Sequence, residues 1–307
     1  MSPSAALQSP IFRSYLWFLL SVLICAGIVL TIAHFVLRRD TGLVWSTYRS
    51  WLVMAPLAAA AVFAGRIPFI CGLTAIAILA FREFARVSGL THDWWTVGVI
   101  YTGIIATGLY SLGVFSEATA LVPLVTFGLI LLGPILRNQT RDAVRRMSLG
   151  IIGFLYLGWM FGQLGSLANS ANAYGYLCYL LLATELNDVA AFTFGKLFGR
   201  HPLRSAISPR KTWEGALGAL AFSVALPWVL RFSFPYFGPW QLLLTGLIVG
   251  VGGQLGDLSL SVIKRDLGAK DMGASIPGHG GILDRIDSLI FTAPLFMLMA
   301  LHYYPER

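Results

Sequence analysis

The chain has 307 residues, of which 57% are hydrophobic and only 12% are charged, and its mean hydropathy is +0.74. Soluble domains carry about 25% charged residues, so this composition excludes an ordinary water-exposed globule and predicts an integral membrane protein. The net charge of +8 does not indicate nucleic-acid binding, because the basic residues lie in short stretches between apolar segments.

Apolar runs long enough to cross a bilayer follow one another along the chain. A spanning helix needs about 20 residues, and charged residues, Pro and Gly mark where the runs end. The second and third runs are short and are separated only by Gly65, Arg66 and Pro68, so they form either a tight hairpin or a re-entrant pair. We therefore predict an all-α, polytopic integral membrane protein with nine or ten transmembrane helices, at approximately residues 12–37, 50–65, 67–82, 95–114, 117–136, 148–168, 173–195, 214–232, 239–262 and 283–303.

Basic residues fall in every second loop between these helices, while the opposite loops hold little beyond Arg66 and Arg231. By the positive-inside rule the basic loops face the cytoplasm. This predicts a multi-pass protein of the cell (inner, cytoplasmic) membrane with its active site facing the cytoplasm, where nucleotide is available. No internal repeat or linker marks a second domain, so we expect one membrane domain over 1–307, with a helical scaffold over about 1–170 and a catalytic part over about 171–307.

The seventh predicted helix contains a polar interruption. Thr184, Glu185, Asn187 and Asp188 stand in an otherwise apolar segment, and Glu185 and Asp188 share one helical face. Ionisable residues inside membrane helices usually serve function. These side chains either line a polar cavity or form a contact between helices.

The loop that follows is basic and begins near Arg204. Ser208 and Pro209 mark a turn, and Arg210 and Lys211 add positive charge. Trp213 can stack on a base or anchor at the membrane interface. Composition alone favours the simpler interpretation, a basic cytoplasmic loop with an interfacial aromatic residue.

The ninth predicted helix carries a polar stripe. Gln254, Asp257, Ser261 and Lys264 recur at intervals of three and four residues and so share one face. A carboxylate on this stripe lies below the membrane surface, where an unpaired charge is costly. Asp257 therefore needs a cation, a metal or a water-filled cavity.

Two further carboxylates open the last helix. Asp284 and Asp287 are three residues apart on one face, and they repel each other unless positive charge lies between them. Together with Asp257 they are suitable oxygen ligands for Mg²⁺. The alternative is that these acids form interfacial salt bridges with Arg265 and Arg285.

A loop rich in cations and glycine separates the two groups of carboxylates. Lys264, Arg265, Lys270 and Asp271 precede the segment PGHGG at 277–281. Glycines let backbone N–H groups approach a phosphate, and the cations neutralise it. Phosphoryl chemistry uses metal ions and cations together. His279 is either a phosphate donor or a turn residue.

At this point the chain resembles the phosphatidate cytidylyltransferases, also called CDP-diacylglycerol synthases. Residues 261–287 read SVIKRDLGAKDMGASIPGHGGILDRID and fit the family signature throughout, S-x-x-K-R-x4-K-D-x-G/S/A-x2-hydrophobic-P/G/S-x-H-G-G-hydrophobic-x-D-R-hydrophobic-D. The segments ISPRKTWEG from Ile207 and FREFARV around Glu83 are similar to two other family segments. The resemblance is firm from about Leu181 to the end and loose before it.

The resemblance implies transfer of a cytidylyl group from CTP to phosphatidate, giving CDP-diacylglycerol and pyrophosphate in phospholipid biosynthesis. The implied partners are CTP, phosphatidate and membrane lipids, with a homodimer as an option and no nucleic acid. The implied cofactor is Mg²⁺, with a monovalent cation as an option for a second metal. By the same resemblance, Asp257, Asp284 and Asp287 hold the metals and act in catalysis with Lys264 and Arg265. Substrate binding is expected of Ser208, Arg210, Lys211, Ser261, Lys270, Asp271, His279 and Asp188.

One segment departs from the family pattern. Residues 184–192 read TELNDVAAF, where the family usually has Trp, then Asp, Ser or Thr, Gly or Ala, Ala and Tyr. Asp188 is kept, but its altered surroundings leave the lipid acceptor open and are compatible with a paralogue. Two alternatives follow: a CTP-dependent kinase of a polyprenol or similar lipid alcohol, and an ion-coupled transporter. A transporter is disfavoured because the polar residues are confined to the last four helices and their loops.

Overall fold

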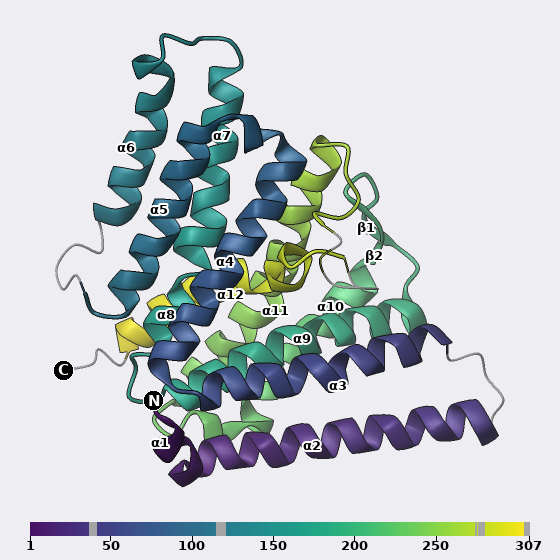
Figure 1. Ribbon diagram of the computed structural model, residues 1–307. Helices are drawn as coiled ribbons and strands as arrows, with labels where there is room; N and C mark the ends of the chain where they lie inside the picture. Colours follow the sequence, from purple (N-terminus) through teal and green to yellow (C-terminus); the bar gives the residue numbers. More distant parts are fainter. Residues whose placement is uncertain (37–41, 115–120, 274, 276–279, 304–307) are drawn as a thin grey trace.

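The computed structural model describes residues 1–36, 42–114, 121–273, 275 and 280–303, and this part of the chain is mostly helical (Figure 1). The first half contains α1 (Pro3–Gln8), α2 (Pro10–Thr31), η1 (Ile32–Val36), α3 (Gly42–Phe63), α4 (Arg66–Ser88), η2 (Leu90–His92), α5 (Trp94–Ser111) and α6 (Leu121–Leu136). The second half contains α7 (Ala143–Gly153), η3 (Phe154–Met160), α8 (Gln163–Leu167), α9 (Ala173–Phe198), β1 (Pro202–Arg204), β2 (Ser208–Thr212), α10 (Trp213–Val229), η4 (Arg231–Ser233), α11 (Pro239–Asp266) and α12 (Leu283–Tyr303).

Each predicted apolar segment overlaps a helix of the structure, and six of these helices are long and apolar enough to cross a membrane. The six are Pro10–Phe35, Arg66–Ser88, Ala143–Leu167, Ala173–Phe198, Pro239–Asp266 and Leu283–Tyr303. Shorter apolar helices cover Tyr48–Phe63, Leu121–Leu136 and Trp213–Val229. The all-α, polytopic prediction is confirmed at this level.

The second and third predicted segments are longer helices than the apolar runs suggested. The second predicted segment began after Arg49 and the third ended at Arg82, but α3 and α4 continue through these two residues. Long basic side chains can keep their charged ends in a polar region while the backbone remains helical. The two helices meet at Gly65, whose φ of +99° favours glycine.

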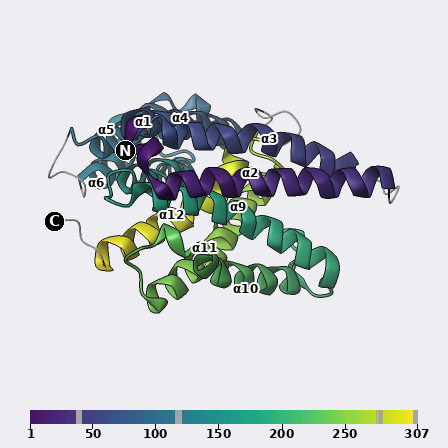
Figure 2. The ribbon, with the colours of Figure 1, turned by 90° about the horizontal axis from the view of Figure 1, so that it is seen from below.

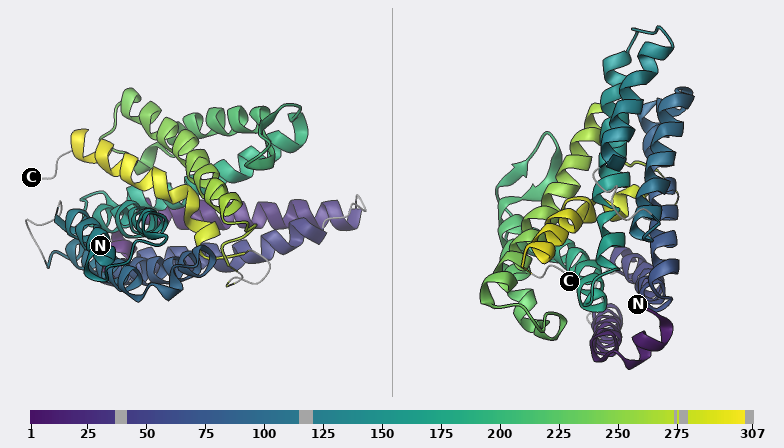
Figure 3. Two further views of the ribbon diagram at one scale, coloured as in Figure 1. Left: turned by 90° about the horizontal axis from the view of Figure 1, so that it is seen from above. Right: turned by 90° about the vertical axis from the view of Figure 1, so that its left-hand side faces the viewer.

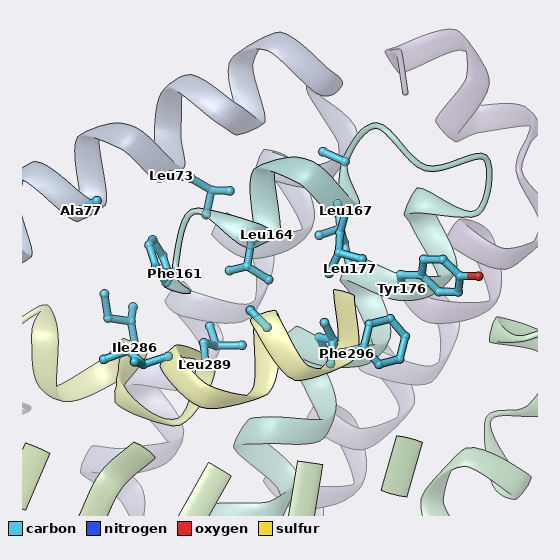
Figure 4. Packing of buried hydrophobic residues seen from close by; sticks show 14 of the residues in the cluster. Leu73, Ala77, Phe161, Leu164, Leu167, Tyr176, Leu177, Ile286, Leu289 and Phe296 are labelled. Carbon is cyan, nitrogen blue, oxygen red and sulfur yellow. The ribbon is translucent and has the colours of Figure 1, made fainter. Parts of the chain in front are cut away.

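The helices form two groups around α12. Helices α4, α5, α6 and α7 stand together, while α2 and α3 lie side by side as a long hairpin (Figures 1 and 2). On the other side of α12, α9, α10 and α11 pack in sequence (Figure 3). A buried apolar core joins the groups, where Leu73 of α4, Leu164 of α8 and Leu289 of α12 face one another (Figure 4).

Glycines allow the close approach of α10, α11 and α12. A Cβ atom added at Gly246 would lie 2.5 Å from the backbone of Val224 on α10, and one added at Gly256 would lie 2.2 Å from the carbonyl oxygen of Asp287 on α12. Small residues are typical of tight helix contacts in membrane proteins because they let backbones approach. The glycines therefore set the distance between the helices that carry the polar side chains.

The loop between α9 and α10 is a short antiparallel β-hairpin. Pro202 pairs with Thr212, and Arg204 pairs with Ser208. The prediction of a turn at Ser208 and Pro209 is wrong, because the turn precedes them and both residues lie in β2. A proline is tolerated there because each strand of a two-stranded sheet is an edge strand.

Large apolar side chains cover much of the outer surface. Trp17 is 70% exposed, Ile135 72% and Phe192 64%. Water would make such a surface unfavourable, whereas lipid acyl chains match it. The protein is therefore a multi-pass membrane protein.

Candidate active site

A polar cavity of about 550 Å³ lies among α9, the β-hairpin, α10, α11 and α12. Acidic and basic side chains from all of these elements except α10 and from the loop before α12 line it. The charged lining residues are Asp188, Lys196, Arg210, Lys211, Asp257, Lys264, Asp271, Asp284, Arg285 and Asp287. The structure thus brings together residues that lie up to 99 positions apart in the sequence.

Asp257 lies on the face of α11 that points into the cavity. Its carboxylate forms an ion pair with Lys211 of β2 and accepts a hydrogen bond from the Ser261 hydroxyl at 3.3 Å. Gly256 brings this turn of α11 against the backbone of Asp287. Of the cation, metal or water-filled cavity that the sequence required for Asp257, the structure supplies a cation, Lys211, at the lining of a polar cavity.

Asp284 joins three parts of the site. Its Oδ1 accepts from the Lys264 ammonium at 2.8 Å. Its Oδ2 accepts from the backbone N–H groups of Met272 at 2.9 Å and Gly281 at 3.1 Å. One carboxylate at the start of α12 therefore holds both the end of α11 and the glycine-rich loop.

Asp287 and Asp188 lie on either side of Ser288. The Oδ1 of Asp287 accepts from the Ser288 backbone N–H at 2.7 Å, and the Ser288 hydroxyl donates to Asp188 at 3.1 Å. Asp287 is only 7% exposed. Of the polar segment in the seventh predicted helix, Asp188 thus lines the cavity, while Asn187 beside it faces α10 and accepts from the Ser223 hydroxyl at 3.0 Å.

Several predicted site residues do not line the cavity. Arg265 is exposed and donates to the carbonyl oxygens of Ile207 at 3.2 Å and Ala269 at 3.4 Å, so it ties the hairpin to the end of α11. Ser208, Ser261 and Lys270 are absent from the described lining. His279 lies outside the described residues.

The salt bridges differ from those proposed as an alternative. Among the described residues, Asp257 and Asp284 pair with Lys211 and Lys264, whereas the sequence suggested Arg265 and Arg285 as partners. Lys211 lies in β2, and Lys264 lies on the same face of α11 as Asp257. The sequence did not reveal Lys211 as the partner of Asp257 because the hairpin that carries Lys211 folds back over α11. It did not reveal Lys264 as the partner of Asp284 because these residues lie on two different helices.

Four polar or charged lining residues were not predicted as site residues: Lys196, Thr212, Gln254 and Arg285. Gln254 belongs to the polar stripe that contains Asp257, which is a signal the sequence offered. Lys196 resembled an ordinary charge at the end of a spanning helix. Its place in the cavity follows from the position of α9 relative to the hairpin.

Glu214 fixes the hairpin to the start of α10. Its carboxylate accepts from the backbone N–H groups of Arg200 at 3.1 Å and His201 at 3.3 Å, and it contacts His201 Nδ1 at 2.6 Å. Thr212 caps α10 by accepting from the Gly215 N–H at 3.2 Å. These contacts hold Arg210 and Lys211 above the cavity.

The cavity suits a ligand that carries several negative charges together with cations. Lysine and arginine side chains can neutralise phosphate groups, and carboxylates can hold a divalent ion between phosphate oxygens. No group of three His, Cys, Asp or Glu side chains is arranged to hold a metal within the described part of the chain. Instead, two of the three predicted metal ligands, Asp257 and Asp284, are each paired with a lysine.

Comparison with known proteins identifies the relatives of this chain. The model of the "Cytidylyltransferase family" matches residues 45–303. The phosphatidate cytidylyltransferase of Staphylococcus haemolyticus (strain JCSC1435) is 37% identical over 180 residues, which cover 58% of this chain and 68% of the relative. The corresponding enzyme of Staphylococcus saprophyticus is 36% identical over 180 residues, with the same coverage. "Uncharacterized protein YnbB" of Escherichia coli (strain K12) is 32% identical over 233 residues, covering 72% of this chain and 75% of the relative.

Proposed function

The chain belongs to the cytidylyltransferase family, and from this premise we propose that it transfers the cytidylyl group of CTP to phosphatidate. The products are CDP-diacylglycerol and pyrophosphate, and the reaction serves phospholipid biosynthesis. The similarity to two staphylococcal phosphatidate cytidylyltransferases supports this reaction. The observation that carries the proposal is the charged cavity among apolar helices, which offers cations to phosphates beside a surface that suits lipid.

The chemistry explains why the site is built from charges. A phosphate oxygen of phosphatidate attacks the α-phosphorus of CTP, a new P–O bond forms, and the bond to the bridging oxygen of pyrophosphate breaks. The attacking oxygen is already an anion at neutral pH, so a general base is unnecessary. The site must instead bring two polyanions together and stabilise the charge that develops on pyrophosphate.

The chain's own cations perform this task. Arg210 and Lys211 on the hairpin and Lys264 on α11 bind phosphate oxygens from different sides of the cavity. Lys196 and Arg285 add positive charge from α9 and α12. Fixed cations of this kind lower the barrier because their positions need little rearrangement during the reaction.

The acidic side chains have the chemistry of divalent-cation ligands, although the described residues hold two of them in ion pairs with lysines. Asp257, Asp284 and Asp287 line one cavity, and their oxygen atoms are the ligands that Mg²⁺ prefers. These three residues would hold Mg²⁺, with a monovalent cation as an option for a second metal. The bound metal would neutralise phosphate charge and polarise the α-phosphorus. Lys211 and Lys264 hold the carboxylates of Asp257 and Asp284 on the cavity side.

The membrane arrangement follows from the apolar helices and the basic loops. The six long helices and the three shorter apolar ones of the described chain make nine spans of one membrane domain, α5 makes a tenth where it also crosses, and residues 171–307 form the catalytic part. The cavity opens to the cytoplasm from the inner membrane, because the basic hairpin borders it. Phosphatidate approaches from the lipid while CTP arrives from water. The enzyme acts as a monomer or a homodimer.

The two rival functions are not favoured. A CTP-dependent lipid-alcohol kinase would attack the γ-phosphorus with a neutral hydroxyl and would therefore need a base. An ion-coupled transporter would carry polar residues in helices throughout the chain, whereas every charged residue that lines this cavity lies between Asp188 and Asp287.

A labelling experiment tests the proposal directly. Purified protein in detergent is incubated with phosphatidate, Mg²⁺ and CTP labelled either at the α-phosphorus or at the γ-phosphorus, with EDTA as a control. We expect lipid-extractable label from the α-labelled nucleotide only, matched by pyrophosphate and abolished by EDTA. Lipid label from γ-labelled CTP and a polyprenol would establish the kinase instead. Absence of both from folded protein would direct attention to the segment around Asp188 and to another lipid phosphate as acceptor.

A further inference from the structure

A buried carboxylate from the first half of the chain reaches the catalytic half. Glu83 lies on α4 and is only 4% exposed. Its Oε2 accepts a hydrogen bond at 3.1 Å from the backbone N–H of Leu283, which is 200 positions later. Leu283 is the first residue of α12, and N–H groups in the first turn of a helix have no partner within that helix. Glu83 therefore supplies a cap for α12 from another helix.

The backbone of the glycine-rich loop packs against the same carboxylate at two points. A Cβ atom at Gly273 would lie 2.6 Å from Oε1 and Cδ of Glu83, and one at Gly281 would lie 2.5 Å from Oε2. Both distances are shorter than any ordinary contact of a Cβ atom. Two glycines are thus required where the two ends of the loop pass Glu83.

The acidic group is costly at this position. Its second oxygen, Oε1, is buried and has no hydrogen-bond partner in the described part of the chain. Phe81 and Phe84, its neighbours on α4, are buried apolar residues. A carboxylate is expensive in such surroundings, and an apolar side chain would fill the space at lower cost. Unlike an apolar side chain, glutamate at position 83 can accept the hydrogen bond from α12 beside the loop.

We propose that Glu83 is a positioning residue for the cytidylyl transfer. It holds the first turn of α12, which carries Asp284 and Asp287, and it fixes the loop that leads into this turn. Asp284 holds the Gly281 N–H from the other side, so the end of the loop lies between two carboxylates. Glu83 does not line the cavity and acts only through these groups. This inference rests on the proposed function for its effect on the rate, although the holding of the loop can be measured without substrate.

The test compares Glu83→Ala, Glu83→Gln and Tyr15→Phe. Glutamine keeps an oxygen that can accept from Leu283, whereas alanine does not. Tyr15→Phe removes a different buried hydrogen bond, the 2.5 Å contact with Ser233, at residues outside the polar cavity. We expect Glu83→Ala to lower kcat about 10- to 100-fold, as misplaced reacting groups do, while the other two variants stay within about threefold of the wild type.

Hydrogen–deuterium exchange without substrate gives the second measurement. Glu83→Ala should exchange faster in peptides that cover 267–287, and Glu83→Gln and Tyr15→Phe should match the wild type there. If Glu83→Ala does not fold, Glu83→Asp replaces it, because its shorter side chain cannot reach Leu283. Unchanged exchange and unchanged kcat would overturn the inference, as would equal losses of kcat in the Gln and Ala variants. Faster exchange in Glu83→Ala supports it even if the wild type transferred no cytidylyl group, in which case only the proposed function would fail.

Discussion

Lys211 and Lys270 both lie in basic loops, but only Lys211 lines the cavity and pairs with Asp257. Replacing Lys211 with methionine keeps much of the side-chain volume and removes the charge. We expect Lys211→Met to lower kcat/KM by about 100-fold or more, because it removes a fixed cation from the proposed phosphate site. The control is Arg141→Met, at an exposed residue of another basic loop and outside the described lining, and it should stay within about threefold. Equal losses in an assay of lipid-linked cytidine would contradict this assignment.

Asp287 is the most buried of the three predicted metal ligands. Asp287→Asn keeps the shape and removes the negative charge, so the Ser288 N–H retains its acceptor. We expect activity to fall by about 100-fold or more with the melting temperature preserved. The control is Asp142→Asn, an exposed residue before α7. Full activity of Asp287→Asn across a titration of Mg²⁺ would remove Asp287 from the metal site.

The sequence predicted which residue types form the site better than it predicted their partners. The polar stripe on α11 and the paired carboxylates on α12 are periodic patterns, and periodicity is visible in a sequence. The pairing of Asp257 with Lys211 depends on the hairpin, whose position over α11 follows from contacts such as that of Arg265 with Ile207. Such contacts join separate elements and leave no periodic signal.

At the scale of elements, Gly256 decides how closely α11 approaches α12. A Cβ atom there would lie 2.2 Å from the Asp287 carbonyl oxygen, so Gly256→Ala must push the two helices apart. We expect a loss of about 1–3 kcal/mol in stability and a larger loss of activity, because Asp257 and Asp287 separate. Gly72→Ala on α4, where nothing lies within 4 Å, should be neutral or stabilising. Thermal unfolding and the cytidylyl-transfer assay measure both effects.

Asp93 joins α5 to the basic loop before α7. It accepts from the Thr96 N–H at 3.2 Å and from Arg137 at 2.8 Å. Burial raises the pKa of Asp93, but the hydrogen bonds from Thr96 and Arg137 outweigh this effect, and the pKa lies below its ordinary value of 3.8. The folded protein therefore stabilises the ionised form of the Asp93 carboxylate.

This shift predicts how stability depends on pH. Because the pKa of Asp93 is lower in the folded than in the unfolded state, its contribution is complete above the unfolded pKa and is lost as pH falls through the folded pKa. Asp93→Asn should lower the melting temperature at pH 7, and the difference from the wild type should shrink below about pH 4. Melting temperatures of both proteins across pH 3–8 provide the measurement. A constant difference across this range would contradict the assignment.

The helices were predictable because each needs a long apolar run, whereas the hairpin was not. Its residues are polar, its strands are short, and Pro209 suggested a turn rather than a strand. The strands are paired by only a few residues and held at their base by Glu214. A polar segment of this length offers no alternation strong enough to predict a strand.

At the scale of the whole molecule, the cavity depends on segments from both halves of the chain. The second half of the chain supplies the described lining, but Glu83 of α4 contacts the start of α12, and the core around α8 joins the groups of helices. The predicted division into a scaffold over about 1–170 and a catalytic part over about 171–307 therefore matches the residues that line the cavity. It does not match the residues that hold those lining residues in place, because some of them belong to the first half. Sequence patterns located the lining because charge is rare in this chain. The residues that hold the lining in place are buried apolar side chains and the buried carboxylate of Glu83. In the sequence they look like the residues of any other helix core.

The orientation of the whole molecule decides whether CTP can reach the cavity. In a variant whose Cys25, Cys71 and Cys178 are replaced by serine, single cysteines are introduced as Ser205→Cys in the hairpin turn or Tyr236→Cys between α10 and α11. Both positions are exposed, and α10 is the only apolar helix long enough to separate two membrane faces that lies between them in the described chain. We expect a membrane-impermeant maleimide to label Cys at 205 in inside-out vesicles and Cys at 236 in right-side-out vesicles, because basic loops remain in the cytoplasm. Detergent-permeabilised vesicles, in which both should react, control for reactivity. The reverse pattern would place the cavity outside the cell, away from CTP, and would contradict the proposed function.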